Sequence, residues 1–214
     1  MSDTVARLGQ IGLVPVVRLE RAEDAVPLGE ALIRGGLPCA EITFRTAAAA
    51  EAIAKLVAAC PEMIVGAGTV LNIQQAQQAS DAGAAFIVSP GFSPQVVDWC
   101  IERKLPVLPG VVTPTEIMAG LDRGLRIFKF FPAEAYGGVA TIKALSAPFG
   151  GVRFMPTGGI SAKNLADYLA LPAVHAVGGS WMVESKLIAG EEWDEITRLA
   201  AEACEIVRRV RPAN

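Results

Sequence analysis

The chain has 214 residues, of which 52% are hydrophobic and 19% charged, and this composition excludes a disordered protein. The net charge is −3 and no basic run is longer than the pair Arg208–Arg209, which argues against a nucleic-acid partner. The mean hydropathy of +0.40 is high, but the longest uncharged stretch, residues 63–80, contains too many polar side chains to cross a membrane. We therefore expect a protein with a large core and no membrane partner.

Metal sites and secretion are not expected. The four cysteines lie far apart and the only histidine is His175, so neither a zinc site nor a disulfide framework is indicated. At the N-terminus, Asp3 stands where a signal peptide would be basic, and the apolar run 11–17 is broken by Gly12 and Pro15. These features predict a soluble, cytoplasmic protein.

Eight short apolar runs are predicted to form strands, and the segments between them space apolar residues three or four apart, as helices do. In chain order, the predicted strands are Val14–Leu19, Cys39–Phe44, Met63–Ala67, Ala85–Val88, Pro106–Leu108, Ile127–Phe131, Val152–Met155 and Val174–Val177. A short helix is expected before the first strand. Ser93-Pro94 and Thr113-Pro114 each place a capping hydroxyl and a proline at a helix start.

Eight units of about 25 residues match a minimal (β/α)8 TIM barrel of the α/β class. No linker or low-complexity segment divides the chain, so we expect a single domain over residues 1–214. A doubly wound open sheet would use the same elements, and the strand count does not exclude it. Short apolar strands are typical of parallel strands covered on both faces, and we prefer the barrel.

The second predicted strand ends in the sequence Glu41-Ile42-Thr43-Phe44-Arg45. Because strand side chains alternate, Glu41, Thr43 and Arg45 share one face and the apolar pair faces the helices. The polar set is thus predicted to point into the barrel, where buried charges need a ligand or a partner. A purely structural Glu41–Arg45 ion pair is the alternative.

Lys129 lies in the middle of the aromatic run Ile127–Phe131. Lysine is almost never buried without a partner, so this side chain either extends to solvent at the barrel end or acts as a nucleophile. Apolar neighbours and positive charge from Arg18 or Arg45 would favour the neutral amine, which can attack a carbonyl. The other five lysines fall on predicted helices or loops.

Glycine-bearing turns follow three of the predicted strands: Gly66–Thr69, Thr157–Ile160 and Gly178–Ser180. The last two follow the seventh and eighth strands, where TIM barrels commonly bind phosphate. Glycine lets the backbone approach an anion, and the N–H groups of a following helix, together with the Ser180 hydroxyl, can donate to phosphate oxygens. We therefore predict a phosphate site here, with plain tight turns as the alternative. Thr69 could donate to a carboxylate.

Six motifs together resemble the signature of the 2-keto-3-deoxy-6-phosphogluconate (KDPG) aldolase and 4-hydroxy-2-oxoglutarate aldolase family. They are Glu41-Ile-Thr-Phe-Arg-Thr46, Gly66-Ala-Gly-Thr-Val-Leu71, Ser89-Pro-Gly91, Phe128-Lys-Phe-Phe-Pro-Ala-Glu134, Pro156-Thr-Gly-Gly-Ile160 and Gly178-Gly-Ser-Trp181. The resemblance implies a class I aldolase of the Entner–Doudoroff pathway that cleaves KDPG to pyruvate and D-glyceraldehyde 3-phosphate. It also implies cleavage of 4-hydroxy-2-oxoglutarate to pyruvate and glyoxylate, no cofactor or metal, and a homotrimer.

The resemblance also assigns roles to individual residues. Lys129 would form the Schiff base with the substrate, and Glu41 would be the acid/base that shuttles protons. The remaining substrate-binding residues would be Arg45 and Thr69 at the pyruvate carboxylate, Thr157 near the substrate chain, Gly158, Gly159, Gly179 and Ser180 at the phosphate, and Pro90. Arg18 departs from relatives that carry an aliphatic residue there, and it would add to anion binding.

Three alternatives remain open at this stage. A 2-dehydro-3-deoxy-6-phosphogalactonate aldolase shares the Gly-Ala-Gly-Thr motif and differs in the preferred configuration at C4. A phosphosugar isomerase or epimerase on the same barrel would use Glu41 as base, with Lys129 stabilising an enolate. A protein that binds a phosphorylated ligand without turnover would need no desolvated amine.

Overall fold

The protein is described by a computed structural model over residues 2–212, in which the strands form two sheets with only parallel pairings. A curled six-stranded sheet has the order β5-β4-β3-β2-β1-β9, and a three-stranded sheet has the order β6-β7-β8. The strands are β1 (Leu13–Val17), β2 (Cys39–Thr43), β3 (Ile64–Gly68), β4 (Ile87–Val88), β5 (Val107–Leu108), β6 (Gly110–Val111), β7 (Ile127–Phe130), β8 (Arg153–Pro156) and β9 (Val177–Gly179). The α/β class with parallel strands is confirmed.

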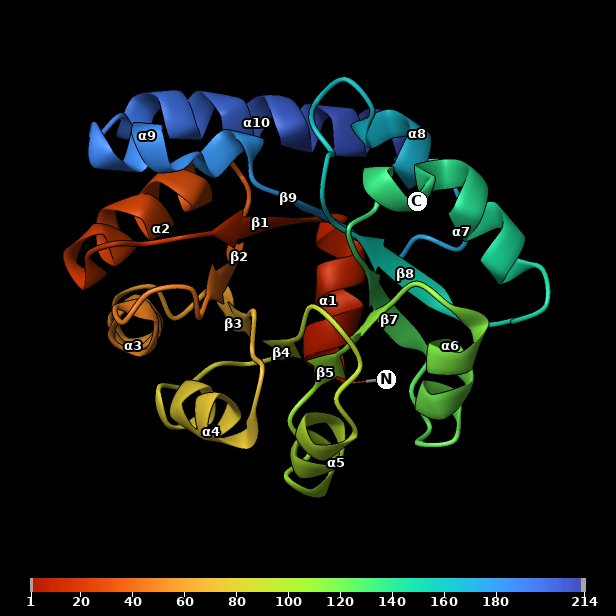
Figure 1. The fold of residues 1–214 in the computed structure, drawn as a ribbon. Helices are drawn as coiled ribbons and strands as arrows, with labels where there is room; N and C mark the ends of the chain where they lie inside the picture. The colour runs from red at the N-terminus through yellow and green to blue at the C-terminus, as the bar shows by residue number, and fades with distance from the viewer. Residues whose placement is uncertain (1, 213–214) are drawn as a thin grey trace.

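Helices alternate with the strands and surround them (Figure 1). They are α1 (Asp3–Ile11), α2 (Ala25–Arg34), α3 (Ala49–Ala59), α4 (Ile73–Asp81), α5 (Pro94–Glu102), α6 (Pro114–Leu121), α7 (Gly138–Ser146), α8 (Leu165–Leu169), α9 (Ser185–Ala189) and α10 (Trp193–Val210), with 3-10 turns η1 (Ala22–Asp24), η2 (Glu134–Tyr136) and η3 (Trp181–Val183). The predicted caps are present, since the Ser93 and Thr113 side chains accept from backbone N–H groups in the first turns of α5 and α6. Within residues 2–212, no helix is long and apolar enough to cross a membrane.

Six predicted strands are observed with each end within two residues of its predicted position, and two differ more. The run Pro106–Leu108 was expected to be one strand, but strand structure continues beyond it: β5 and β6 lie on either side of Pro109, one in each sheet. Proline has no N–H to donate to a ladder, which explains the break, although its carbonyl still accepts from Lys129 N at 2.9 Å. The eighth strand was expected at Val174–Val177 and is observed as β9, three residues further on.

The shift of β9 has a physical cause. Val174 forms only an isolated bridge with Phe154 of β8, whereas Gly178 and Gly179 pair with Val14 and Pro15 of β1. The first half of the apolar run therefore lies along one sheet and the glycines continue the other. Glycines that read as a turn in the sequence are thus part of the strand.

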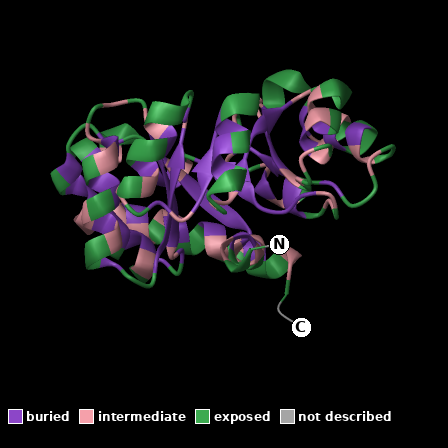
Figure 2. Ribbon diagram, turned by 90° about the horizontal axis from the view of Figure 1, so that it is seen from below, coloured by how far each residue is buried: buried purple, intermediate pink, exposed green. Residues whose placement is uncertain are grey.

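The core lies between the strands and the surrounding helices, whose outer faces are exposed (Figure 2). Ile42 of β2 is fully buried on the side opposite Glu41, as the alternation predicts. Helix α1 packs at the amino ends of the strands, where His175 Nε2 lies 2.7 Å from the Val5 carbonyl oxygen. His175 is buried, and its Nδ1 has no partner among the described residues.

Candidate active site

The buried amine predicted on the aromatic strand, that of Lys129, contacts the carboxylate of Glu41, which lies on a strand of the other sheet. Lys129 Nζ of β7 lies 3.2 Å from Glu41 Oε1 of β2, and the two residues are only 4% and 0% exposed. The lysine therefore does not extend to solvent. The Phe131 ring adds an apolar wall, because its centroid is 5.2 Å from Lys129 Nζ.

Glu41 has one oxygen occupied and one free. Its Oε1 accepts from Lys129, whereas its Oε2 is buried with no hydrogen-bond partner among the described residues. A buried carboxylate oxygen without a donor is costly, so such an atom is a candidate for contact with a ligand. Glycine at position 68 makes the site possible: a methyl group there would lie 2.6 Å from Glu41 Cγ and 2.7 Å from Cδ.

A cleft of about 360 Å³ opens at the carboxyl ends of the strands, where the barrel model expects chemistry. Phe131 and Thr43 line it, and each lies two residues beyond a member of the ion pair on its own chain segment. The cleft therefore lies beside the buried pair, with Phe131 between it and Lys129, although neither Lys129 nor Glu41 lines it. Seven of the predicted substrate-binding residues line it: Arg18, Arg45, Thr157, Gly158, Gly159, Gly179 and Ser180.

Arg45 does not take the predicted buried position. Strand β2 ends at Thr43, and the chain then turns, with Arg45 N donating to the Thr43 carbonyl at 2.8 Å. The strand alternation stops there, so Arg45 is exposed at the cleft and Glu41 pairs with Lys129 instead. The alternative of a structural Glu41–Arg45 ion pair is wrong.

Besides the buried pair Lys129 and Glu41, two predicted site residues, Pro90 and Thr69, lie outside the lining of the cleft. Pro90 follows β4, and its backbone packs so closely on Gly110 that no side chain would fit at position 110. Thr69 follows β3 with φ +55°, a conformation that costs a non-glycine residue free energy and that clusters at functional sites. Both residues still sit at carboxyl ends of strands.

The turn after β8 has the conformation that only glycine adopts readily. Gly158 has φ +102° and Gly159 has φ +78°, and both lie at the wall of the cleft. Arg18 and Ser180 also line the cleft with polar side chains, and Arg18 Nη2 lies 2.7 Å from Glu20 Oε1. An anion bound here would meet backbone N–H groups and positive charge.

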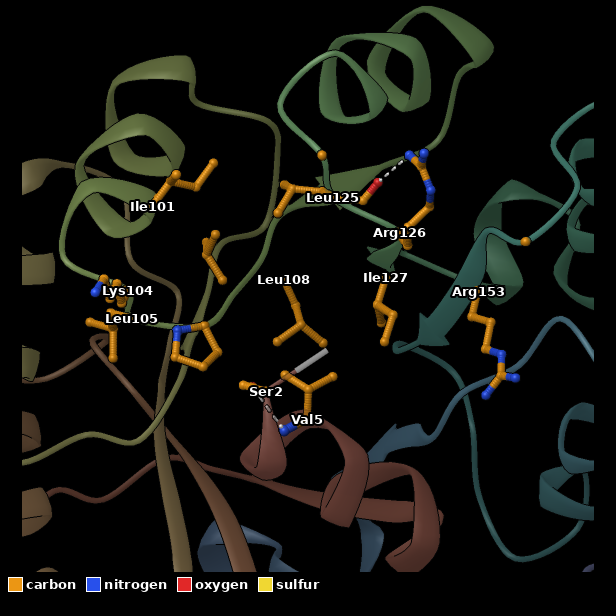
Figure 3. Close-up of a pocket in the computed structure, with 14 residues that line it drawn as sticks. Ser2, Val5, Ile101, Lys104, Leu105, Leu108, Leu125, Arg126, Ile127 and Arg153 are labelled. Carbon is orange, nitrogen blue, oxygen red and sulfur yellow. Dashed lines mark hydrogen bonds between the residues drawn. The ribbon is translucent and has the colours of Figure 1, made fainter.

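A larger cavity, of about 510 Å³, lies at the opposite end of the strands (Figure 3). Its walls are mainly aliphatic, with Leu108, Leu125 and Ile127 facing Val5 of α1. It contains no buried ion pair, and it lies beside the amino ends of β5, β7 and β8. Size alone therefore does not locate the reactive groups, and the smaller cleft is the better candidate site.

A family model for KDPG and KHG aldolases matches residues 4–199. The chain belongs to the KDPG and KHG aldolase family. It is 52% identical over 200 residues to the 2-dehydro-3-deoxy-phosphogluconate aldolase of Treponema pallidum, covering 94% of this chain and 95% of that one. It is 48% identical over 193 residues to the KHG/KDPG aldolase of Escherichia coli K12, covering 90% and 91%.

A solved structure of KDPG aldolase from Legionella pneumophila, with pyruvate captured at low pH as a covalent carbinolamine intermediate, superposes with a TM-score of 0.91. That chain is 40% identical, and the match covers 94% of this chain and 98% of that one. The family indicated by the six motifs is thereby confirmed. The sequence analysis did not predict the hydrogen bond between Tyr168 and Glu134 beside this site. The two residues are 34 positions apart, and no local pattern links them.

Proposed function

We propose that the protein is a class I aldolase that cleaves KDPG to pyruvate and D-glyceraldehyde 3-phosphate, and 4-hydroxy-2-oxoglutarate to pyruvate and glyoxylate. The observation that carries this proposal is the buried contact between Lys129 Nζ and Glu41 Oε1 at 3.2 Å, beneath a cleft lined by arginines and glycines. The family supports the reaction class, and this geometry supports Lys129 as the nucleophile and Glu41 as the base.

Lys129 attacks the C2 ketone of the substrate as the neutral amine. The ammonium form can first lose its proton to Glu41, which lies within hydrogen-bond distance. Glu41 then gives this proton to the departing hydroxyl, so that the carbinolamine loses water to form a protonated imine and Glu41 is again a carboxylate. When the C3–C4 bond breaks, its electron pair moves into this cation, so that a neutral enamine forms instead of a carbanion.

Glu41 moves the remaining protons. Its free Oε2 can accept the C4 hydroxyl proton, directly or through water, as the aldehyde leaves. The same carboxyl group then returns a proton to C3 of the enamine, and water hydrolyses the imine to release pyruvate. No step requires a metal or a cofactor.

The cleft orients the substrate around this centre. Arg45 and Thr69 hold the pyruvate carboxylate and Thr157 lies along the substrate chain, while Pro90 borders the site. The phosphate binds at Gly158, Gly159, Gly179 and Ser180, with Arg18 adding positive charge. Contacts far from the reacting bond place C2 near the amine and lower the entropic cost of reaction.

The two sheets form one closed (β/α)8 barrel within a single domain of residues 1–214. The β5 and β6 segments flank Pro109 in consecutive positions and join the sheets at one edge. At the other edge, the bridges Phe154–Val174 and Thr157–Gly178 connect β8 to the β9 region. The family resemblance supports a cytoplasmic homotrimer, which light scattering on the purified protein and cell fractionation test.

Pyruvate release, coupled to lactate dehydrogenase, tests the proposed activity. We expect turnover of KDPG and of 4-hydroxy-2-oxoglutarate, and loss of turnover of both in Lys129→Ala. A preference for the phosphogalactonate epimer would assign the alternative aldolase. Stabilisation by sugar phosphates without pyruvate release would instead indicate a binding protein, and interconversion of phosphosugars an isomerase or epimerase.

A further inference from the structure

A hydrogen bond that the proposed reaction does not use lies behind the Gly158–Gly159 turn. Tyr168 of α8 is only 1% exposed, and its hydroxyl donates to Oε1 of Glu134 in η2. Burial and this hydrogen bond to the carboxylate raise the pKa of Tyr168, so the phenol stays protonated and remains a donor. The contact joins two segments that are 34 residues apart in sequence.

The backbone around Glu134 forms the rear wall of the turn. Ala133 N donates to the Thr157 carbonyl at 2.8 Å, and Glu134 N donates to the Gly158 carbonyl at 3.1 Å. A methyl group on Gly159 would lie 2.6 Å from both Cβ and Cγ of Glu134. The methylene groups of Glu134 therefore pack directly on the turn to which we assign the phosphate.

The carboxylate of Glu134 does not share this position with the methylene groups; it lies next to the Tyr168 hydroxyl and Gly138. A methyl group on Gly138 would be 2.7 Å from the Tyr168 hydroxyl and 3.0 Å from Glu134 Oε1. Gly138 is the first residue of the nine-residue helix α7, whose N-terminus favours negative charge. The side chain of Glu134 thus presents its apolar part to the turn and its charge to Tyr168 and α7.

We propose that Tyr168 and Glu134 act as a positioning pair that sets the preference of the cleft for a phosphorylated substrate. The pair shapes the Gly158–Gly159 turn and keeps the Glu134 carboxylate away from the bound phosphate, which it would otherwise repel. This inference rests on the proposed function, because it assigns the phosphate to that turn. It adds a specificity role for two residues that do not touch the reacting atoms.

Steady-state kinetics on a phosphorylated and an unphosphorylated substrate distinguish this specificity role from a general loss of folding or activity. In Tyr168→Phe the carboxylate is released, and we expect the KM for KDPG to rise about tenfold, as for the loss of one charge-assisted hydrogen bond. Its kcat for KDPG and both constants for unphosphorylated 4-hydroxy-2-oxoglutarate should stay within about twofold of wild type. Equal losses on both substrates, or an unchanged KM for KDPG, would overturn the proposal.

Variants of Glu134 provide matched controls. Glu134→Gln keeps an acceptor for the Tyr168 hydroxyl and removes the charge, so its KM for KDPG should match wild type. The double variant Tyr168→Phe/Glu134→Gln should recover most of the loss, since no charge is left to repel phosphate. A double variant as impaired as Tyr168→Phe would refute charge repulsion as the cause.

A second substitution at Glu134 keeps the test independent of Tyr168, which is buried. Glu134→Ala removes the methylene packing at an exposed position, where folding should be preserved. It should raise the KM for KDPG, whereas Glu134→Gln should not. Equal KM values in these two variants would contradict the role of the packing.

Calorimetric titration with inorganic phosphate makes the same comparison without turnover. Phosphate should bind wild type and Glu134→Gln similarly, and Tyr168→Phe about tenfold more weakly. Equal affinities would overturn the proposal even if the protein released no pyruvate. Failure of the aldolase assignment would instead appear as absence of pyruvate release from either substrate in the wild-type protein.

Discussion

Replacing Gly68 by alanine should disable the site without changing a charged residue. The added methyl group would overlap the Glu41 carboxylate, with Cγ at 2.6 Å and Cδ at 2.7 Å, and would come closer still to Oε1. Carbon atoms in contact normally lie about 3.5–4.0 Å apart, so the carboxylate must move by roughly 1 Å. The position is buried in β3, which leaves little room for relief by the backbone.

The size of the effect follows from that displacement. The Lys129–Glu41 distance is 3.2 Å, and a further 1 Å would break the hydrogen bond. A misplacement of about 1 Å can cost 10²-fold in rate, so we expect kcat for KDPG to fall about 100-fold in Gly68→Ala. Overpacking should also lower the free energy of unfolding by roughly 1–3 kcal/mol.

The assay is pyruvate release at saturating KDPG, with thermal unfolding followed by circular dichroism. Gly150→Ala is the matched control, because a methyl group there meets no atom within 4 Å. We expect that control to retain full activity. A kcat for Gly68→Ala within about threefold of wild type would refute the argument that the Glu41 position controls the reaction.

Two further predictions concern stability. Lys129→Met leaves the Glu41 carboxylate buried without its partner, so this variant should lower the free energy of unfolding by roughly 3–5 kcal/mol. The double variant Lys129→Met/Glu41→Gln should recover most of this loss. Equal Tm values for the single and the double variant in calorimetry would contradict this prediction. Burial lowers the pKa of His175, with Arg153 and Arg211 also disfavouring its charge, so the folded state favours neutral imidazole. The contribution of His175 to the free energy of unfolding should be complete above the unfolded-state pKa of about 6.5 and should be lost as the pH falls below it. The Tm of the wild type should therefore fall between pH 8 and pH 5, and His175→Gln should make this fall shallower. An unchanged slope in the variant would show that other groups cause the fall in Tm.

Local patterns were sufficient for much of the fold and for the two central residues. Alternation on β2 placed Glu41 inside and Ile42 outside, and the aromatic run around Lys129 marked a lysine with an apolar setting. Both inferences depend only on neighbours within a few residues. They needed no knowledge of how the strands are arranged.

The features that could not be predicted from the sequence depend on contacts between segments that are far apart along the chain. The partner of Glu41 comes from β7, 88 residues away, and only the arrangement of the strands in space brings it there. The turn at Arg45 ends the alternation on which its burial was predicted. Likewise, strand structure extends past Leu108 to both sides of Pro109, and β9 continues into glycines because β1 pairs with them.

Borohydride reduction in the presence of pyruvate tests the central claim most directly, because it converts the imine into a secondary amine that water cannot hydrolyse. Peptide mass spectrometry of the wild-type protein should then show one reduced pyruvate adduct, located on Lys129 and absent without pyruvate. Lys129→Ala should carry no adduct. An adduct on another lysine, or none on an enzyme that releases pyruvate, would contradict the account.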